Sequence, residues 1–142
     1  MFKHILVVCT GNICRSPMAE ALLRAAAPKR TVESAGVAAV IGWGATQEAI
    51  ELMKERGHDL SAHRARQLTP RLLAASDLVL TMERMHNNWI NQRFPQYRGK
   101  VHKLLRWRDE QDVEDPYGLS RNIYEKTYED IATGVADWLK RI

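Results

Sequence analysis

Cysteine is scarce in this sequence: its 142 residues contain only Cys9 and Cys14, which lie close together. A disulfide framework of a small secreted protein normally joins distant elements, which this pair does not do. Long apolar runs are also missing. The apolar stretch within residues 1–8 is too short for a signal peptide, and no run approaches the roughly 20 residues of a membrane-spanning helix. The sequence therefore predicts a cytoplasmic protein without membrane insertion.

The usual features of metal sites and of nucleic-acid-binding surfaces are absent as well. The five histidines show no metal-ligand spacing, and there is no Cys-x-x-Cys pair. The 21 basic and 17 acidic residues are interspersed, so the net charge of +4 indicates a mild attraction to anions rather than a nucleic-acid-binding face. We therefore expect no metal, no organic cofactor and no nucleic-acid partner.

Apolar runs and helical patterns alternate along the chain. Its length and its hydrophobic content of 45% suit one domain over residues 1–142. Strands are predicted at 5–8, 31–34, 77–82 and 101–105, and helices at 17–28, 46–57, 70–74, 83–94 and 120–142. In the helix over 83–94, Met85, Trp89 and Ile90 are the expected inward-facing positions. The alternation is typical of an α/β fold with a mostly parallel sheet, in which ligands bind beyond the carboxyl ends of the strands.

Residues 9–17, Cys-Thr-Gly-Asn-Ile-Cys-Arg-Ser-Pro, connect the first strand to the first helix. Ser16 is a good N-cap and Pro17 fits the first helical position, so the helix is expected to begin there. The loop before it must curl with its N–H groups pointing inward. Such a loop forms an anion cradle at a helix N-terminus, and Cys9 stands at the strand end that leads into it.

The residue types in this loop suit phosphate chemistry. The positive helix end and the guanidinium of Arg15 favour the thiolate form of Cys9, which is the nucleophilic form. Arg15 can also hold two phosphate oxygens with its planar fork of donors. Gly11 permits a close approach of the backbone, Asn12 tolerates left-handed geometry, and Ser16 can donate to the thiolate. A lone cysteine would more often be structural, but the spacing Cys-x5-Arg-Ser between strand and helix favours a phosphate-handling nucleophile.

The segment 107–119 is acidic and rich in turn residues, which ordinarily indicates a solvated loop. The leaving oxygen of a phosphate ester, however, needs a proton, and a carboxylic acid on a loop over the pocket can supply it. Five acidic residues are candidates for this role: Asp109, Glu110, Asp112, Glu114 and Asp115. Only Asp115 is stiffened by a following proline, Pro116, and the residues alone leave the choice open.

Residues 9–17 resemble the active-site loop of the low-molecular-weight protein tyrosine phosphatases, and Asp115-Pro116-Tyr117 resembles their general-acid motif. The segments 33–36 and 61–67 also match, so the likeness extends over nearly the whole chain. The resemblance implies a three-layer α/β domain of the phosphotyrosine protein phosphatase I type, with a central four-stranded twisted sheet. It also implies hydrolysis of phosphotyrosine through a cysteinyl-phosphate, with Cys9 as nucleophile, Arg15 as phosphate-binding residue and Asp115 as general acid and base.

The resemblance implies roles for the surrounding residues too. Phosphate binding is expected from the rest of the loop, which comprises Thr10, Gly11, Asn12, Ile13, Cys14 and Ser16. Val40, Trp43 and Tyr117 are expected to flank the substrate ring, and His63 to support the loop through Asn12 and Ser16. On sequence alone, His63 would be interpreted as structural and Trp43 equally well as a packed surface aromatic. For Cys14, reversible trapping of oxidised Cys9 and a purely structural role stay equally open.

Within the family, the short loop at 38–44 and the single tyrosine after Asp115-Pro116 resemble the Gram-negative branch associated with capsule and exopolysaccharide production. Gly118 stands where many relatives carry a second tyrosine. The branch implies a phosphotyrosyl protein as partner, namely an autophosphorylating tyrosine kinase of polysaccharide export. The chain is expected to be a monomer or a weak homo-oligomer.

Other functions that use such a cradle fit less well. An arsenate reductase on the same fold needs additional cysteines to relay a disulfide outward, and only Cys14 is available. A phosphotyrosine-binding module without turnover would not need a nucleophile, an arginine and an acid together. A P-loop nucleotide hydrolase is disfavoured because the loop lacks the Gly-Lys-Ser/Thr ending that grips phosphates and magnesium.

Overall fold

The computed structural model describes residues 2–142, and strands alternate with helices along them. The strands are β1 (His4–Cys9), β2 (Thr31–Gly36), β3 (Leu78–Thr81) and β4 (Val101–Lys103). The helices are α1 (Arg15–Ala26), α2 (Gln47–Glu55), α3 (Pro70–Ala75), α4 (Arg84–Arg93) and α5 (Arg121–Leu139), with a 3₁₀ helix η1 (Pro95–Lys100) before β4. Within the described part of the chain, no helix is both long and apolar enough to cross a membrane.

The four strands form one parallel sheet with the order β2-β1-β3-β4. β1 is central, so Ile5 has Val32 of β2 on one side and Leu78 of β3 on the other. Because the strands are parallel, their carboxyl ends, including the end of β1 at Cys9, gather at one edge of the sheet. The predicted α/β class with a mostly parallel four-stranded sheet is confirmed.

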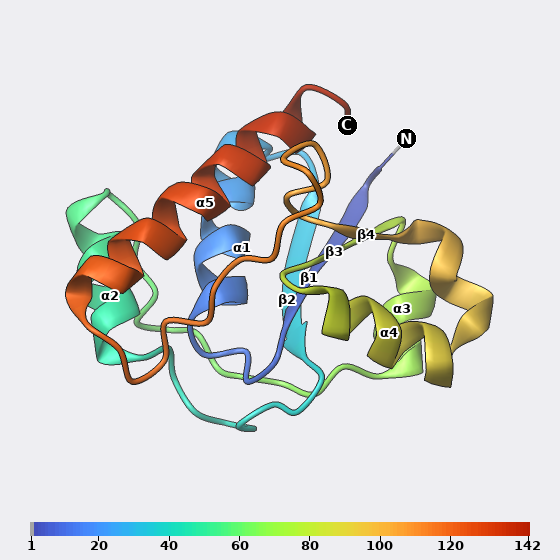
Figure 1. Ribbon diagram of the computed structural model, residues 1–142, viewed down its shortest axis with the longest axis horizontal. Coiled ribbons are helices and arrows are strands. Elements are labelled where there is room, and N and C mark those ends of the chain that lie inside the picture. The colour runs from blue at the N-terminus through green and yellow to red at the C-terminus, as the bar shows by residue number, and fades with distance from the viewer. Residues whose placement is uncertain (1) are drawn as a thin grey trace.

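Helices cover both faces of the sheet and make three layers, with α1 and α5 on one face and α3 and α4 on the other (Figure 1). Side chains of β1 alternate between the two layers. Ile5, Val7 and Cys9 join the apolar core under α1, α2 and α5, whereas Leu6 and Val8 join the core under α3 and α4. A strand has a two-residue period, so a strand buried on both faces must be apolar throughout, as β1 is.

The start of α1 differs from the prediction. Ser16 is not the N-cap, because α1 begins at Arg15 and Cys14 occupies the N-cap position. The Ser16 hydroxyl instead lies 2.9 Å from Sγ of Cys9 and accepts a hydrogen bond from the Asn12 side chain at 2.8 Å. The Ser16 side chain therefore forms hydrogen bonds within the loop instead of capping the helix.

The orientation of α4 also differs from the prediction. The expected inward position of Met85 is wrong, since its side chain is 50% exposed and His86 is buried instead. Glu83 and His86 form a reciprocal capping box, in which each side chain accepts a hydrogen bond from the other residue's backbone N–H. This box turns His86 toward the sheet. The last strand is also shorter than the predicted 101–105 and ends at Lys103.

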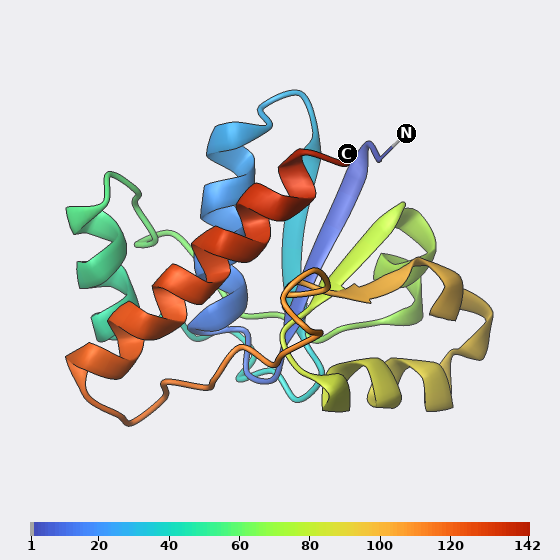
Figure 2. The ribbon, with the colours of Figure 1, turned by 45° about the horizontal axis from the view of Figure 1, so that its top comes forward.

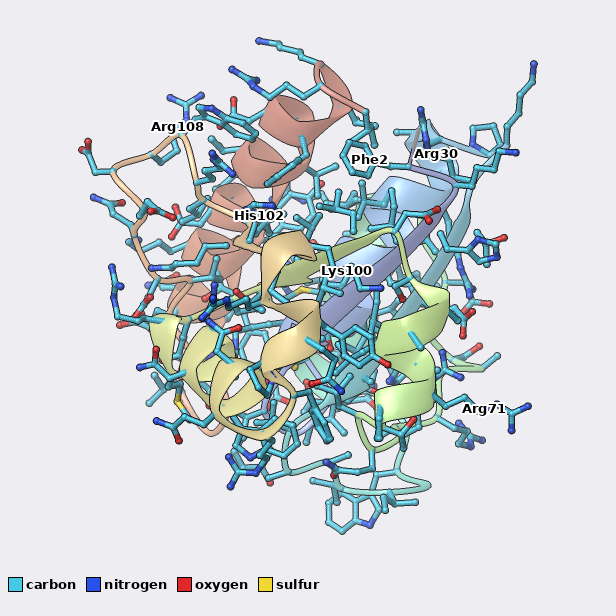
Figure 3. The ribbon with its side chains drawn as sticks, turned by 90° about the vertical axis from the view of Figure 1, so that its right-hand side faces the viewer. Phe2, Arg30, Arg71, Lys100, His102 and Arg108 are labelled. Atoms are coloured by element: carbon cyan, nitrogen blue, oxygen red, sulfur yellow. The ribbon has the colours of Figure 1, made fainter. Side chains whose placement is uncertain are left out.

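The connecting loops at the carboxyl edge lie opposite the two ends of the described chain (Figure 2). At the edge with the chain ends, Nε of Arg30 donates to the carbonyl of Phe2 at 2.8 Å, and Figure 3 labels both residues. At the carboxyl edge, β2 ends at Gly36, directly against the loop after β1. A Cβ atom at Gly36 would overlap the carbonyl oxygen of Thr10, so this position needs glycine.

We predict that Gly36→Ala lowers the free energy of unfolding by about 1–3 kcal/mol, because the added methyl group must displace the Thr10 backbone. Urea denaturation measures the effect. Gly99→Ala is the matched control, since a Cβ at Gly99 would meet nothing within 4 Å. Equal stability of the two variants would contradict the prediction.

Candidate active site

Asn12 holds the loop between β1 and α1 in a curled conformation. Its φ of 60° lies in the left-handed region, which asparagine tolerates better than most residues. Its buried side chain donates to the hydroxyls of Ser16 at 2.8 Å and Ser34 at 2.9 Å, and accepts from the backbone N–H of Arg66 at 2.9 Å. These three hydrogen bonds stabilise an otherwise unfavourable backbone conformation.

Cys9 lies at the end of β1 with 1% of its surface exposed, and its Sγ is 2.9 Å from the Ser16 hydroxyl. The hydroxyl oxygen already accepts a hydrogen bond from Asn12. Its own proton is therefore free to point at the sulfur, which is the arrangement that a nucleophilic thiolate requires.

The N-terminus of α1 is open toward the loop, because no side chain among residues 2–142 caps it. Its positive end is available to an anion. Arg15, the first residue of α1, is 1% exposed, and its Nε has no hydrogen-bond acceptor within the described residues. A buried donor without an acceptor is unfavourable, so a bound anion such as phosphate would complete this arrangement.

The rest of the Arg15 guanidinium is anchored. Its Nη1 donates to Oε2 of Glu83 at 2.6 Å and to the carbonyl of Val113 at 2.9 Å. Burial by itself would lower the pKa of Arg15, but the neighbouring Cys9, Glu83 and Asp115 raise it above its ordinary value. Arg15 is thus a fixed cation whose remaining donors face the loop.

Among the five acidic candidates, Asp115 is the one that the structure places beside Arg15. Its Oδ2 is 3.8 Å from Nη2 of Arg15, and its Oδ1 accepts from the backbone N–H of Tyr117 at 3.1 Å. The side chain is half exposed. The segment that carries it runs across the carboxyl edge toward α5 (Figure 2). A carboxyl group in this place can exchange protons both with a bound substrate and with water.

Cys14 is buried beside this carboxyl group, with its Sγ 3.8 Å from Oδ1 of Asp115. Burial raises the pKa of the Cys14 thiol to about 12; the charges of Cys9 and Asp115 add to the rise, and Arg15 opposes it. Cys14 is therefore a neutral thiol near pH 7, and both cysteines are free. Trapping of an oxidised Cys9 by Cys14 stays a prediction.

A cavity of about 350 Å³ opens beside the loop, and Ile13, Trp43 and Tyr117 line it. Trp43 and Tyr117 are 59% and 57% exposed, so their ring faces are available to a ligand. The structure thus brings two of the three expected ring-flanking residues to one cavity. The third, Val40, lies against the loop, with its N–H donating to the Gly11 carbonyl at 3.1 Å.

His63 contacts the loop through the backbone of Asn12. Its Nε2 lies 2.6 Å from the Asn12 carbonyl oxygen, and a carbonyl only accepts, so Nε2 carries the proton. Asn12 in turn donates to the Ser16 hydroxyl at 2.8 Å, so His63 is connected to Ser16 through Asn12. The geometry therefore agrees with the supporting position that the family resemblance implies.

Sequence reasoning missed two residues that the structure brings to the site, Glu83 and His86. Nδ1 of His86 accepts from the Glu83 backbone N–H at 3.0 Å, so its Nε2 carries the proton and donates to the Thr10 hydroxyl at 2.9 Å. Glu83 follows β3 at the edge where β1 ends, and an acidic residue in that place is a usable signal. His86 has no comparable signal, because its orientation depends on the capping box.

Within residues 2–142, no group of three His, Cys, Asp or Glu side chains could hold a metal ion. A larger hollow of about 910 Å³ lies between α1, β2 and residues 57–66. Four of the charged side chains that line it are paired, Arg24 with Glu20 at 2.8 Å and Arg66 with Glu33. The loop with the unpaired Nε of Arg15 is therefore the better candidate for the active site.

Comparisons with known proteins identify the family of the chain. Residues 4–142 match the family model described as low molecular weight phosphotyrosine protein phosphatase. The probable low molecular weight protein-tyrosine-phosphatase EpsP of Ralstonia nicotianae is 44% identical over 142 residues, covering 100% of this chain and 97% of the relative. The low molecular weight protein-tyrosine-phosphatase Wzb of Escherichia coli is 42% identical, with the same coverage. The structure of Vibrio vulnificus Wzb in complex with benzylphosphonate has a TM-score of 0.96 and 39% identity, covering 100% of both chains.

We predict that the buried His86 makes the fold less stable in mild acid. Burial lowers the pKa of His86 from 6.5 to about 4; Arg15 adds to the decrease, and Asp112 and Asp115 oppose it. In the unfolded chain the imidazole therefore becomes protonated below about pH 6.5. In the folded chain it stays neutral down to about pH 4. The stabilisation is complete above pH 6.5 and is lost as the pH falls toward 4.

Urea denaturation of wild type and His86→Gln at about pH 7.5 and about pH 5 tests this linkage. Between these values the wild type should lose about 1–2 kcal/mol more unfolding free energy than the variant, because glutamine does not titrate. Parallel losses in the two proteins would show that His86 is not responsible.

Proposed function

Because the chain belongs to the low molecular weight phosphotyrosine protein phosphatase family and is a protein-tyrosine phosphatase, we propose that Cys9, Arg15 and Asp115 carry out its reaction in two displacements. One observation carries these assignments. The buried Nε of Arg15 lacks an acceptor among the described residues and belongs to a helix whose N-terminus is uncapped, next to the Cys9 sulfur. This combination suits a phosphoryl group held within reach of a thiolate.

In the first displacement, the Cys9 thiolate attacks phosphorus in line with the tyrosyl oxygen. The amides of the loop at 10–16 and the Arg15 guanidinium stabilise the negative charge on the three equatorial oxygens. Asp115, in its protonated form, transfers its proton to the tyrosyl oxygen as the P–O bond breaks. Tyrosine leaves as a neutral phenol, and a cysteinyl-phosphate remains on Cys9.

In the second displacement, water attacks the phosphorus of the cysteinyl-phosphate. The Asp115 carboxylate accepts a proton from this water, the S–P bond breaks, and inorganic phosphate leaves. The Ser16 hydroxyl stabilises the Cys9 thiolate that is released, at the 2.9 Å distance seen in the structure. Glu83 and Val113 keep Arg15 in place during both displacements. These steps use groups of the chain and water alone.

The cavity beside the loop is the proposed site for the tyrosyl ring. Ile13, Trp43 and Tyr117 offer apolar and aromatic surface next to the cradle, and Val40 backs the loop. A phosphotyrosine is long enough to reach the cradle while its ring lies between these residues, whereas the shorter phosphoserine is not. Vibrio vulnificus Wzb has been solved with benzylphosphonate, an aromatic phosphonate, which supports this arrangement.

The proposed physiological substrate is an autophosphorylating tyrosine kinase of a polysaccharide export system. The relatives EpsP and Wzb and the sequence resemblance to the Gram-negative branch support this partner. We propose that the chain acts on it in the cytoplasm as a single domain and as a monomer or a weak homo-oligomer. With the kinase expressed, deletion of the gene should raise tyrosine phosphorylation of the kinase; an unchanged phosphoproteome would count against it.

Phosphate release from a phosphotyrosyl and a matched phosphoseryl peptide, without added metal, tests the proposed mechanism. We predict turnover of the tyrosyl peptide only and complete loss of activity in Cys9→Ser. Asp115→Asn should lower kcat/KM for the tyrosyl peptide roughly 10²–10⁴-fold. The same variant should lose much less with 2,4-dinitrophenyl phosphate, whose leaving group needs no proton.

Three other outcomes would reject parts of this mechanism. Binding of phosphotyrosine without phosphate release would favour a binding module. Neither binding nor release, together with thiol-dependent arsenate reduction, would favour an arsenate reductase. Equal losses of Asp115→Asn on both esters would exclude Asp115 as the acid.

We predict that Trp43→Ala and Tyr117→Ala raise KM for the phosphotyrosyl peptide roughly tenfold each, because each removes aromatic surface from the ring site. Inhibition by inorganic phosphate serves as the internal control. Its inhibition constant should change less than about twofold, since phosphate has no ring to contact. An equal change in both constants would place these residues in the phosphate cradle rather than beside the ring.

A further inference from the structure

Lys103 is a buried cation that the proposed mechanism does not use. It is the last residue of β4, and it is only 4% exposed. Lysine is rarely buried unless its ammonium is paired, because removal of the charge from water is costly. In this structure the ammonium lies 2.6 Å from Oδ1 of Asp112 and also donates to the backbone carbonyl of Glu110. Both partners belong to the segment that leads to Asp115.

The segment between β4 and Asp115 bends back on itself to reach this ammonium. Asp109 and Glu110 have φ values of 56° and 51°, in the left-handed region that residues with a side chain seldom adopt. Such a turn persists only if other contacts compensate for it. Lys103 supplies two, one to the Glu110 carbonyl at the turn and one to the Asp112 side chain just after it.

Asp112 connects this turn to the catalytic loop. Its Oδ1 also accepts from the backbone N–H of Arg84 at 2.9 Å, at the start of α4. The next residue, Val113, donates to the Met82 carbonyl at 2.8 Å, and its own carbonyl accepts from Arg15 at 2.9 Å. Val113 thus has its own contacts to Met82 and Arg15, Asp112 orients the backbone that leads into it, and Asp115 follows two residues later.

Other contacts hold the two ends of the segment on α5. Arg108 pairs with Asp137 at 3.0 Å, and the Thr127 hydroxyl donates to the Glu114 carbonyl at 3.1 Å. Figure 3 shows Arg108 beside α5, and His102, the neighbour of Lys103 in β4, closer to the sheet. Lys103 thus joins the turn in the middle of the segment to β4.

We propose that Lys103 is a positioning residue for the reaction: by holding Asp112 and the Glu110 carbonyl, it fixes the backbone that places Asp115 over the phosphate cradle. The proposal rests on the acid role of Asp115 under the proposed function. Lys103 does not touch the substrate. Its effect is confined to proton transfer, which depends steeply on the distance between the carboxyl group and the leaving oxygen.

Lys103→Met tests the proposal, because methionine fills the buried space without a charge and the half-exposed Asp112 can be hydrated. We expect kcat/KM for the phosphotyrosyl peptide to fall roughly tenfold. For 2,4-dinitrophenyl phosphate it should change less than about twofold, since that leaving group needs no proton. A merely structural role would lower both values together, and that result, like no change with either ester, would overturn the proposal.

A double-mutant cycle separates this proposal from the mechanism on which it rests. In an Asp115→Asn background, Lys103→Met should cause no further loss with the phosphotyrosyl peptide, because the group that it positions is already inactive. An additional tenfold loss in that background would overturn the proposal while the acid role of Asp115 stands. If Asp115→Asn itself shows no dependence on the leaving group, the acid role fails, and the role of Lys103 fails with it.

Two further variants complete the experiment. Lys126→Met is the matched control, because Lys126 forms a largely exposed pair with Asp130 at 3.0 Å on α5, and its kinetics should equal those of the wild type. Asp112→Asn replaces Lys103→Met if the latter does not fold. It keeps an acceptor for the Arg84 N–H but weakens the bond to the ammonium, and it should show the same selective loss with the phosphotyrosyl peptide. Wild-type kinetics in a folded Asp112→Asn would overturn the proposal.

Discussion

The site depends on the burial of one guanidinium group. A cation as buried as Arg15 is unfavourable unless acceptors surround it. The chain supplies two acceptors, Glu83 after β3 and the Val113 carbonyl before Asp115, and Cys9 at the end of β1 adds an electrostatic contribution. These groups come from three separate segments, so the contacts that make the burial tolerable also fix the nucleophile, the cradle and the acid relative to one another. Nε and Nη2 of Arg15 are left for the substrate, Nε without any acceptor in the described residues and Nη2 at 3.8 Å from Asp115.

Elements with strong local signals could be predicted from the sequence. The apolar run of β1 forms a strand buried on both faces, and Thr46 caps α2 by accepting from the Ala49 N–H. Gly57, after α2, has a positive φ of 89°, as its predicted terminal position requires. The predicted cap role of Ser16 is wrong, whereas its predicted contact with Cys9 is confirmed, because a serine before a helix has two uses. Its hydroxyl can cap the helix or join the loop, and here the partners Asn12 and Cys9, brought close by the fold, decide for the loop.

The site could be predicted where its residues are contiguous and not where they are distant in sequence. Residues 9–16 are contiguous, so their spacing is visible in the sequence and the cradle can be recognised before the fold is known. The choice of Asp115 among five acidic residues depends on the family resemblance, because the residues alone leave it open. In the structure, Asp115 lies 3.8 Å from Arg15. The sequence does not indicate the roles of Glu83, His86 and Lys103, because their hydrogen-bond partners come close only in the folded chain. Hydrophobic periodicity indicates which face of an element is buried, but it does not indicate which polar groups meet there.

The alternation of side chains along β1 has a consequence for the length of that strand. Cys9 shares its face with Ile5 and Val7, and so reaches the layer that contains α1 and Arg15. If one residue were inserted or removed between Val7 and Cys9, the parity of the strand would change and the thiol would turn toward α3 and α4. Every residue of the loop would be intact, yet the nucleophile would be on the wrong side of the sheet. The active site therefore requires the correct number of residues in β1 as well as the correct residues.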